Sequence, residues 1–189
     1  MKSCLTLCAL VLLAGCTATD TLPDRPLTDG QAYLMPLHVM VDDPLRAAEL
    51  RNALRATGVF EDVQTGAGQA GDYSARIQFK SERDMPPMPL IFLSAATLFL
   101  MPLSNGIDTH TDISLLHEGK LLKRYSYRNL THKYTWLLDQ GGEMQEQNIQ
   151  RIARAFAGDL RQDQLLPTAS QAQCCLLYTS DAADEGLGV

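Results

Sequence analysis

The sequence predicts an α+β domain, a two-layer sandwich in which an antiparallel sheet of four to five strands carries two helices on one face, with a short hydrophobic insertion. Three observations lead to this expectation. Several stretches alternate apolar and polar residues, as half-buried strands do. Two other stretches repeat apolar residues at helical spacing. The predicted order is β-α-β-β, insertion, β-β-α, and such runs of strands favour antiparallel pairing.

The first two elements are a strand and a helix. Residues 33–41 are rich in apolar residues but contain Pro36, which favours an edge position or a bulge. Asp43 and Pro44 together are typical of a helix start, and Gly58 is typical of a helix end. Between these signals the apolar side chains share one face, formed by Ala47, Leu50, Ala53, Leu54 and Thr57.

The remaining elements are four strands and a second helix. We expect a short strand at residues 58–63, with Phe60 and Val63 in the core. Residues 73–79 and 107–115 alternate as half-buried strands, and a turn at Gly119 and Lys120 leads into a basic strand at 121–134. Residues 143–164 predict an amphipathic helix whose buried face is Ile149, Ile152, Ala153, Phe156 and Leu160.

Prolines bound an uncharged insertion at residues 85–103. As a helix, residues 90–101 would rise about 18 Å, short of the roughly 30 Å hydrocarbon core of a membrane, so they cannot span it. Two interpretations stay open: an element buried against the sheet, or one that projects into lipid or a partner. On the second interpretation the contact residues are Leu90, Phe92, Leu93, Phe99 and Leu100.

Basic residues gather in the last predicted strand of an acidic chain. The chain has 16 Lys and Arg against 22 Asp and Glu, a net charge of −6, which argues against a nucleic-acid partner. Strand geometry places Arg124 and Arg128 on one face and Lys123 on the other. These side chains are candidates to bind phosphate or carboxylate groups of lipid, lipopolysaccharide or peptidoglycan. The alternative is a solvated strand face whose charges protect an edge.

Asp108, His110 and Asp112 are the candidate metal ligands. Their spacing points all three to one side of a strand, and such sets ligate zinc or manganese, so a metal-dependent hydrolase is an alternative function. Neighbouring side chains on one strand face lie nearly 7 Å apart, however, which does not favour convergence on one ion. The sequence predicts no bound metal, no cofactor and no catalytic residue.

The N-terminus carries a cysteine motif after a short apolar run. Leu13-Ala14-Gly15-Cys16 resembles a bacterial lipobox. The resemblance implies a signal peptide at residues 1–15, cleavage before Cys16, and lipidation of Cys16 with a diacylglyceryl thioether and an acylated amine, palmitate included. Thr17 stands where Asp would favour inner-membrane retention, which implies the periplasmic face of the outer membrane.

The expected domain organisation follows from these boundaries. Residues 16–30 would be the lipidated cysteine and an extended tether, 31–166 a single domain, and 167–189 a disordered tail. From residue 174 the tail resembles a translated sequencing adapter. We therefore expect no disulfide in the mature fold, because four cysteines fall outside it: Cys4, Cys8, Cys174 and Cys175.

A second resemblance concerns the helix end and the strand after it. The pattern is similar to small α+β modules of envelope lipoproteins and assembly factors, and rests on Leu50, Leu54, Gly58, Phe60 and Val63. The element order also resembles the lipoprotein that helps insert lipopolysaccharide at the outer membrane. The resemblance implies a non-catalytic binding or assembly role with an envelope protein or lipid partner. An accessory subunit of an envelope transporter is a further alternative.

Overall fold

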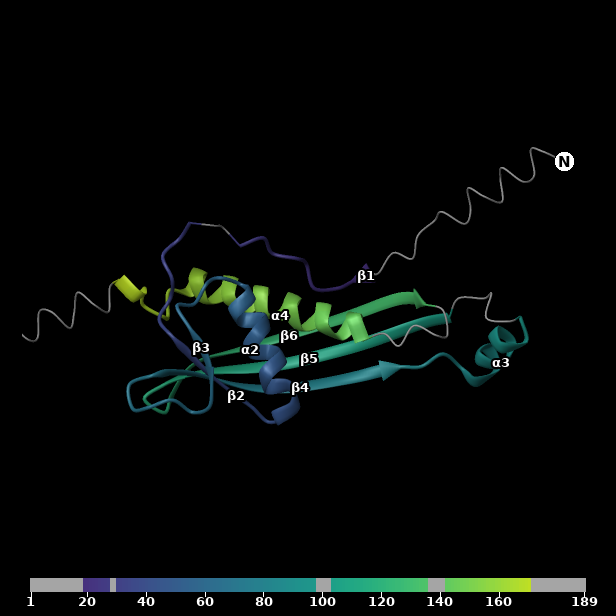
Figure 1. Ribbon diagram of the computed structural model, residues 1–189, viewed down its shortest axis with the longest axis horizontal. Coiled ribbons are helices and arrows are strands. Elements are labelled where there is room, and N and C mark those ends of the chain that lie inside the picture. Colours follow the sequence, from purple (N-terminus) through teal and green to yellow (C-terminus); the bar gives the residue numbers. More distant parts are fainter. Residues whose placement is uncertain (1–18, 28–29, 98–102, 136–141, 171–189) are drawn as a thin grey trace, which may run out of the picture.

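The computed structural model describes residues 19–27, 30–97, 103–135 and 142–170, where the chain forms a six-stranded sheet, two helices over one face and a third helix beyond one end (Figure 1). The predicted α+β class is confirmed. The strand order is β1-β6-β5-β4-β2-β3. In chain order the elements are β1 (Thr19–Asp20), β2 (Leu37–Val41), α2 (Pro44–Ala56), β3 (Val63–Thr65), β4 (Tyr73–Asp84), α3 (Met88–Ala96), β5 (Leu103–His117), β6 (Lys120–Thr135) and α4 (Gly142–Asp163).

The predicted sheet, antiparallel with four to five strands, is wrong in size and in pairing. Strands β4, β5, β6 and β1 are antiparallel neighbours, but β2 is parallel to both β3 and β4. The β2–β3 pair is parallel because the α2 crossover returns the chain to the same end of the sheet. β2 also lies inside the sheet, so Pro36 does not mark an edge. Pro36 precedes the strand, where its missing N–H costs no ladder hydrogen bond.

The loop from β3 to β4 crosses beneath β2 on the sheet face opposite the helices. A Cβ at Gly68, where φ is +74°, would lie 2.8 Å from the His38 ring, so a glycine is needed there. His38 Nε2 lies 3.2 Å from an Asp72 carboxylate oxygen at the end of this loop. The loop therefore covers His38 on this face. The part of the same face that β4, β5 and β6 form, opposite the two core helices, is called the uncovered face below.

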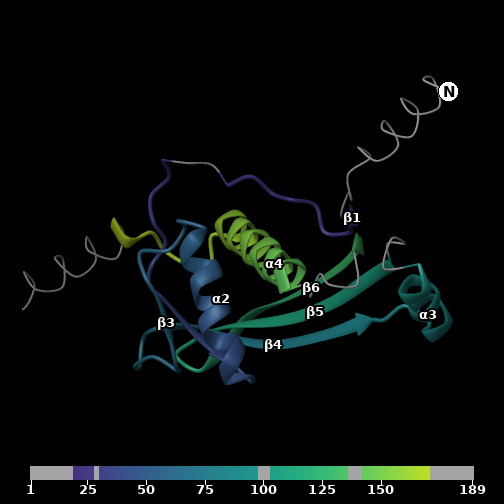
Figure 2. The ribbon, with the colours of Figure 1, turned by 45° about the vertical axis from the view of Figure 1, so that its right-hand side comes forward.

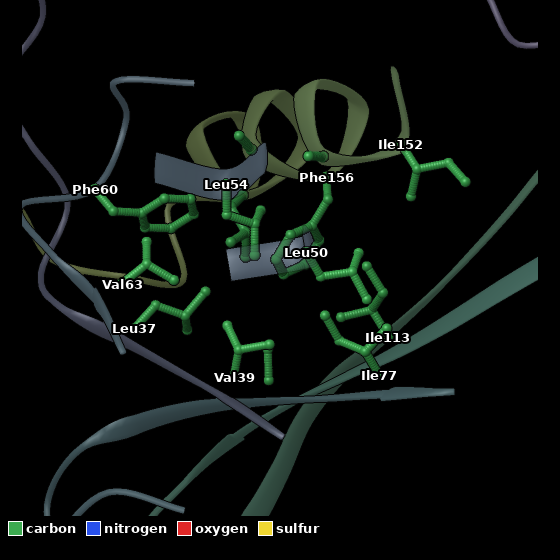
Figure 3. Close-up of a cluster of buried hydrophobic side chains, with 14 of the residues drawn as sticks. Leu37, Val39, Leu50, Leu54, Phe60, Val63, Ile77, Ile113, Ile152 and Phe156 are labelled. Atoms are coloured by element: carbon green, nitrogen blue, oxygen red, sulfur yellow. The ribbon is translucent and has the colours of Figure 1, made fainter. Parts of the chain in front are cut away.

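The two core helices begin, end and pack as their sequence signals predict. The Asp43 carboxylate accepts a hydrogen bond of 3.0 Å from the Leu45 backbone N–H, and α2 ends before Gly58, whose φ is +63°. Both helices contact the same face of the sheet (Figure 2). Figure 3 shows side chains of α2 and α4 meeting those of β2, β4 and β5, among them Leu37, Leu50, Leu54, Ile77, Ile113, Ile152 and Phe156.

The central strands are longer than the sequence predicts. β4 continues to Asp84 rather than Phe79, and β5 begins at Leu103 rather than Ile107. Residues 80–84 are all exposed, so no apolar alternation marks them as strand. This extension carries the sheet toward α3 (Figure 1).

Candidate functional site

The α3 helix projects from the end of the sheet rather than packing in the core. Met88, Phe92 and Leu93 are 63%, 68% and 49% exposed, and Leu90 is 40% exposed. Within α3, Ser94 is the buried residue. Among the strands, α3 contacts β5. For residues 88–97 the interpretation as a core element is therefore wrong, whereas the projecting element agrees with the structure. Phe99 and Leu100 lie outside the described residues.

Local sequence sets the limits of α3. Pro87 precedes the helix and Pro89 lies in its first turn, where proline is tolerated. At the C-terminal end the Thr97 hydroxyl lies within 3.1 Å of the Leu93 carbonyl oxygen and 2.9 Å of the Ser94 carbonyl oxygen. Among the described residues, no helix is long and apolar enough to cross a membrane.

A second feature is the N-terminal strap, residues 19–27, which runs along α4 (Figure 1). The composition of this segment predicts an extended tether, but Thr19 and Asp20 pair with His132 and Thr131 of β6. The Leu22 backbone N–H donates a 2.8 Å hydrogen bond to the Asn129 side-chain oxygen. The described chain is thus part of the sheet from Thr19 onward. Cys16 itself lies outside the described residues.

A buried polar cluster, the latch, joins the strap to the sheet and to α4. Asn129 and Asn148 are fully buried, and the Asn129 side-chain nitrogen donates a 2.7 Å hydrogen bond to the Asn148 oxygen. The Thr131 hydroxyl lies 2.6 Å from that oxygen and 2.5 Å from an Asp20 carboxylate oxygen. The Asn148 nitrogen donates in turn to the Thr109 hydroxyl over 3.2 Å. Buried polar groups of this kind are costly unless satisfied, so the latch favours one position of the strap.

Ion pairs extend the attachment along the outer side of α4. Arg151 lies 2.7 Å from Asp20, and Arg154 lies 2.8 Å from Asp24. Arg25 pairs with Asp159, which also accepts a 2.7 Å hydrogen bond from the Tyr127 hydroxyl. Leu22 and Leu27 pack against the core. Burial first, and then the Asp159 hydrogen bond, raise the pKa of Tyr127 above its ordinary range, so this hydroxyl stays protonated as a donor.

The predicted anion-binding residues do not form one group. Lys123 lies on the helix-covered face, 2.6 Å from Asp163, and this hydrogen bond together with one from Tyr125 lowers the pKa of Asp163. Arg128 lies on the uncovered face and pairs with Asp108 at 2.6 Å, which lowers the pKa of Asp108. Arg124 is also exposed on the uncovered face but does not share either of these ion pairs.

Arg76, on β4, is a basic residue that the charge pattern of the last strand does not include. Sheet register places Arg76 opposite Ser114, and Ser114 opposite Arg124, so two arginines flank a serine in one row across β4, β5 and β6. These three residues line a shallow depression of about 300 Å³. Among the described residues, neither arginine has a hydrogen-bond or ion-pair partner. Alternation alone places Arg76 on the outer face of its strand, but the pairing with Arg124 depends on register.

The three candidate metal ligands lie on the uncovered face without converging. Asp108 accepts hydrogen bonds from Arg128 Nε and Nη2, at 3.1 and 2.6 Å. His110 Nε2 lies 3.3 Å from an Asp112 carboxylate oxygen. Within the described part of the chain, no group of three or more His, Cys, Asp or Glu side chains has the geometry to hold a metal ion. Asp108 is therefore engaged by an arginine instead of facing an ion with the other two.

Comparison with solved structures finds remote similarities, each with a TM-score below 0.5. No family model and no curated protein matches the chain. A minor lipoprotein from Acinetobacter baumannii is 13% identical with a TM-score of 0.45, over 71% of this chain and 97% of that chain. The rare lipoprotein B from Shewanella oneidensis is 13% identical with a TM-score of 0.38, over 75% and 98%. A DUF330 protein from Xanthomonas campestris is 12% identical with a TM-score of 0.48, over 76% and 95%. Likenesses at this level do not identify an activity.

If the latch holds the strap, replacing Asn129 should lower the stability of the whole domain and loosen the strap locally. Asn129→Ala removes a donor to the buried Asn148 side-chain oxygen and the acceptor of the Leu22 N–H, so we expect the free energy of unfolding to fall by about 1–3 kcal/mol. Hydrogen exchange of the Leu22 amide should accelerate. Urea unfolding and amide exchange measure the two effects. Asn52→Ala, on the exposed side of α2, is the matched control and should change stability by less than about 0.5 kcal/mol. Unchanged Leu22 exchange in Asn129→Ala would contradict the latch.

Proposed function

We propose that this chain is a lipid-anchored protein of the bacterial envelope, held at the periplasmic face of the outer membrane by acyl chains on Cys16, with a non-catalytic binding or assembly role. The observation that carries the proposal is the position of β1. β1 begins at Thr19, three residues after Cys16, and is already hydrogen-bonded to β6. Three residues extend at most about 11 Å, so the domain would be held directly at the membrane.

The firmness of the strap supports this arrangement. A long flexible tether would let a domain move freely away from its anchor. Here the strap is fixed by the latch, by two arginines of α4, and by two leucines packed on the core. Two or more acyl chains give stable membrane attachment, so the anchor and the strap together would hold the domain in a defined position.

The uncovered sheet face is the proposed binding surface. Several of its charged side chains pair with one another, as Asp108 and Arg128 do across two strands and Lys80 and Glu82 do within one. Arg76 and Arg124 instead face solvent on either side of Ser114. Guanidinium groups present planar sets of donors that match phosphate and carboxylate oxygens. We therefore propose that this arginine row binds phosphate or carboxylate groups of an envelope component.

The role is proposed as binding rather than catalysis because of what surrounds the candidate ligands. A metal-dependent hydrolase would need the Asp108 carboxylate free to ligate, and Arg128 occupies it. A transporter accessory subunit would be one form of the proposed assembly role, with a protein as the anionic partner. That alternative stays a prediction.

The anchor predicts the outcome of labelling with an alkyne analogue of palmitate in a Gram-negative host. The wild-type chain should take up the label and sediment with outer-membrane fractions. Cys16→Ser should lose the label and leave those fractions. Cys8→Ser, in the same N-terminal segment, is the matched control and should keep both properties. A Cys16→Ser chain that is labelled and fractionated like the wild type would contradict the proposed anchor.

The arginine row predicts weaker anion binding after charge reversal. Arg76→Glu with Arg124→Glu should weaken binding of a soluble disaccharide bisphosphate or a muramyl peptide by at least about tenfold, because two charge-assisted hydrogen-bonding groups are lost. Titration calorimetry on the detergent-solubilised chain measures this. Loss of bisphosphate binding alone indicates a phosphate source, and loss of muramyl peptide binding alone indicates a carboxylate source.

The control for that pair carries the same change in charge elsewhere. Arg51→Glu with Lys120→Glu alters α2 and the start of β6, away from the arginine row. This control should bind both probes as the wild type does. If both double variants bind the probes equally weakly, net charge explains the effect and the arginine row is not a binding site.

A further inference from the structure

The α3 helix presents an apolar surface on several sides. Exposed Met88, Phe92, Leu90 and Leu93 occupy helix positions that, at 100° per residue, span about 200° of the circumference. The sequence has no charged residue from Met85 to Ile107. No described segment covers these side chains. Contiguous exposed apolar surface of this kind marks a contact with a membrane or a partner.

Sheet register shows that α3 and the start of the strap lie at the same end of the molecule. Asp84, the last residue of β4 before α3, pairs with Gly106; Gly106 pairs with His132; and His132 pairs with Thr19. These four residues form one row across four strands. Three inter-strand steps of about 4.8 Å place Thr19 roughly 14 Å from Asp84. Figures 1 and 2 both show β1 and α3 at this end.

On the two strands that lead to α3, the charged residues end close to the row of Asp84 and Gly106. On β4 the last charged residue is Asp84, and on β5 the first is Asp108, two residues from the partner of Asp84. The segment that connects them is uncharged, whereas on the neighbouring β6 Lys133 lies one residue beyond the row. An uncharged segment between two charged strands is the pattern of a chain that leaves water for the apolar side of an interface, and a lysine beside it can extend its ammonium group to the headgroup level.

We propose that α3 lies in the interfacial region of the same membrane leaflet that holds the acyl chains of Cys16, as a second membrane contact of the domain. This inference rests on the proposed lipid anchor and names its lipid surface as the partner of α3. The nine residues of α3 rise about 14 Å, too short to cross a bilayer, so the helix lies within one leaflet. Tyr134, 59% exposed and two residues beyond the same row, is suited to the headgroup level.

A bilayer fits this surface better than a protein groove does. A helix bound in a groove buries one apolar stripe and keeps its other face polar. The exposed apolar residues of α3 instead cover more than half of its circumference. Thr19 lies roughly 14 Å from Asp84 along the row, and Cys16 precedes Thr19 by three residues. An acylated Cys16 would therefore hold α3 at the membrane surface and raise the effective concentration of the helix there.

The test uses photo-crosslinking in the full chain in a Gram-negative host. The photoreactive residue p-benzoylphenylalanine replaces Phe92 in one variant and Met88 in a second, so that one locally disturbed variant does not decide the result. It replaces Tyr33 in the matched control, a side chain 57% exposed that precedes β2 at the opposite end of the sheet. After irradiation of cells, mass spectrometry of the purified chain should show at least about fivefold more phospholipid adduct at positions 88 and 92 than at 33.

Palmitate labelling of the same samples separates this inference from the anchor. A labelled chain with no excess of lipid adduct, or with protein adducts alone, at positions 88 and 92 overturns the membrane contact of α3 and leaves the anchor in place. An unlabelled chain with excess lipid adduct overturns the anchor and supports the helix contact. An unlabelled chain without excess adduct overturns both.

Discussion

The hydrogen bonds among Asn129, Asn148, Thr131 and Asp20 hold the beginning of the described chain on the sheet, and the proposed position of the domain at the membrane depends on them. Asn129 and Thr131 come from β6, Asn148 from α4 and Asp20 from β1, so the latch joins the sheet, a core helix and the strap at one buried point. Isolated polar groups at this depth would destabilise the fold. Satisfied by one another, they favour a single arrangement of the three elements.

The latch fixes the end of the sheet at which the strap begins. The strap starts at one end of the long strands, where α3 also leaves the sheet, and then follows α4 toward the other end. With the proposed anchor at this end, the strands would point away from the membrane, and the uncovered face with Arg76 and Arg124 would stand beside the surface rather than against it. The two proposed contacts therefore do not compete: α3 meets lipid, and the arginine row remains accessible to an anionic envelope component.

Local signals explain which parts of the fold the sequence predicts. Asp43 followed by Pro44 and, later, Gly58 act on neighbouring backbone, so the limits of α2 could be read directly. The buried stripe of α4 follows from spacing alone. Parallel pairing of β2 with β4 is non-local and leaves no periodic mark, and the extension of β4 to Asp84 is exposed on both faces. Pattern reading therefore finds these elements but not their neighbours or their full length.

In the candidate functional site, too, local sequence predicts some features, whereas others depend on tertiary structure. Prolines and the absence of charge identify the insertion, and strand alternation separates Lys123 from Arg124 and Arg128. Whether the insertion packs or projects is a tertiary question that its composition leaves open. The strap resembles a linker in composition, because Pro23 and Pro26 suppress periodicity, while ion pairs such as Asp24 with Arg154 join residues 130 positions apart. The arginine row likewise depends on a register that no single strand encodes.

The membrane anchor at the α3 end of the sheet is tested most directly by how far each end of the sheet lies from the membrane. Energy transfer from a donor on Ser104→Cys or Lys120→Cys to lipid-headgroup acceptors reports this in vesicles that carry the lipidated chain, with Cys174 and Cys175 changed to serine. Thirteen residues of β5 separate the two levels, about 44 Å. An anchor at the α3 end predicts strong transfer from position 104 and little from position 120. Equal transfer from both positions would contradict this placement of the domain.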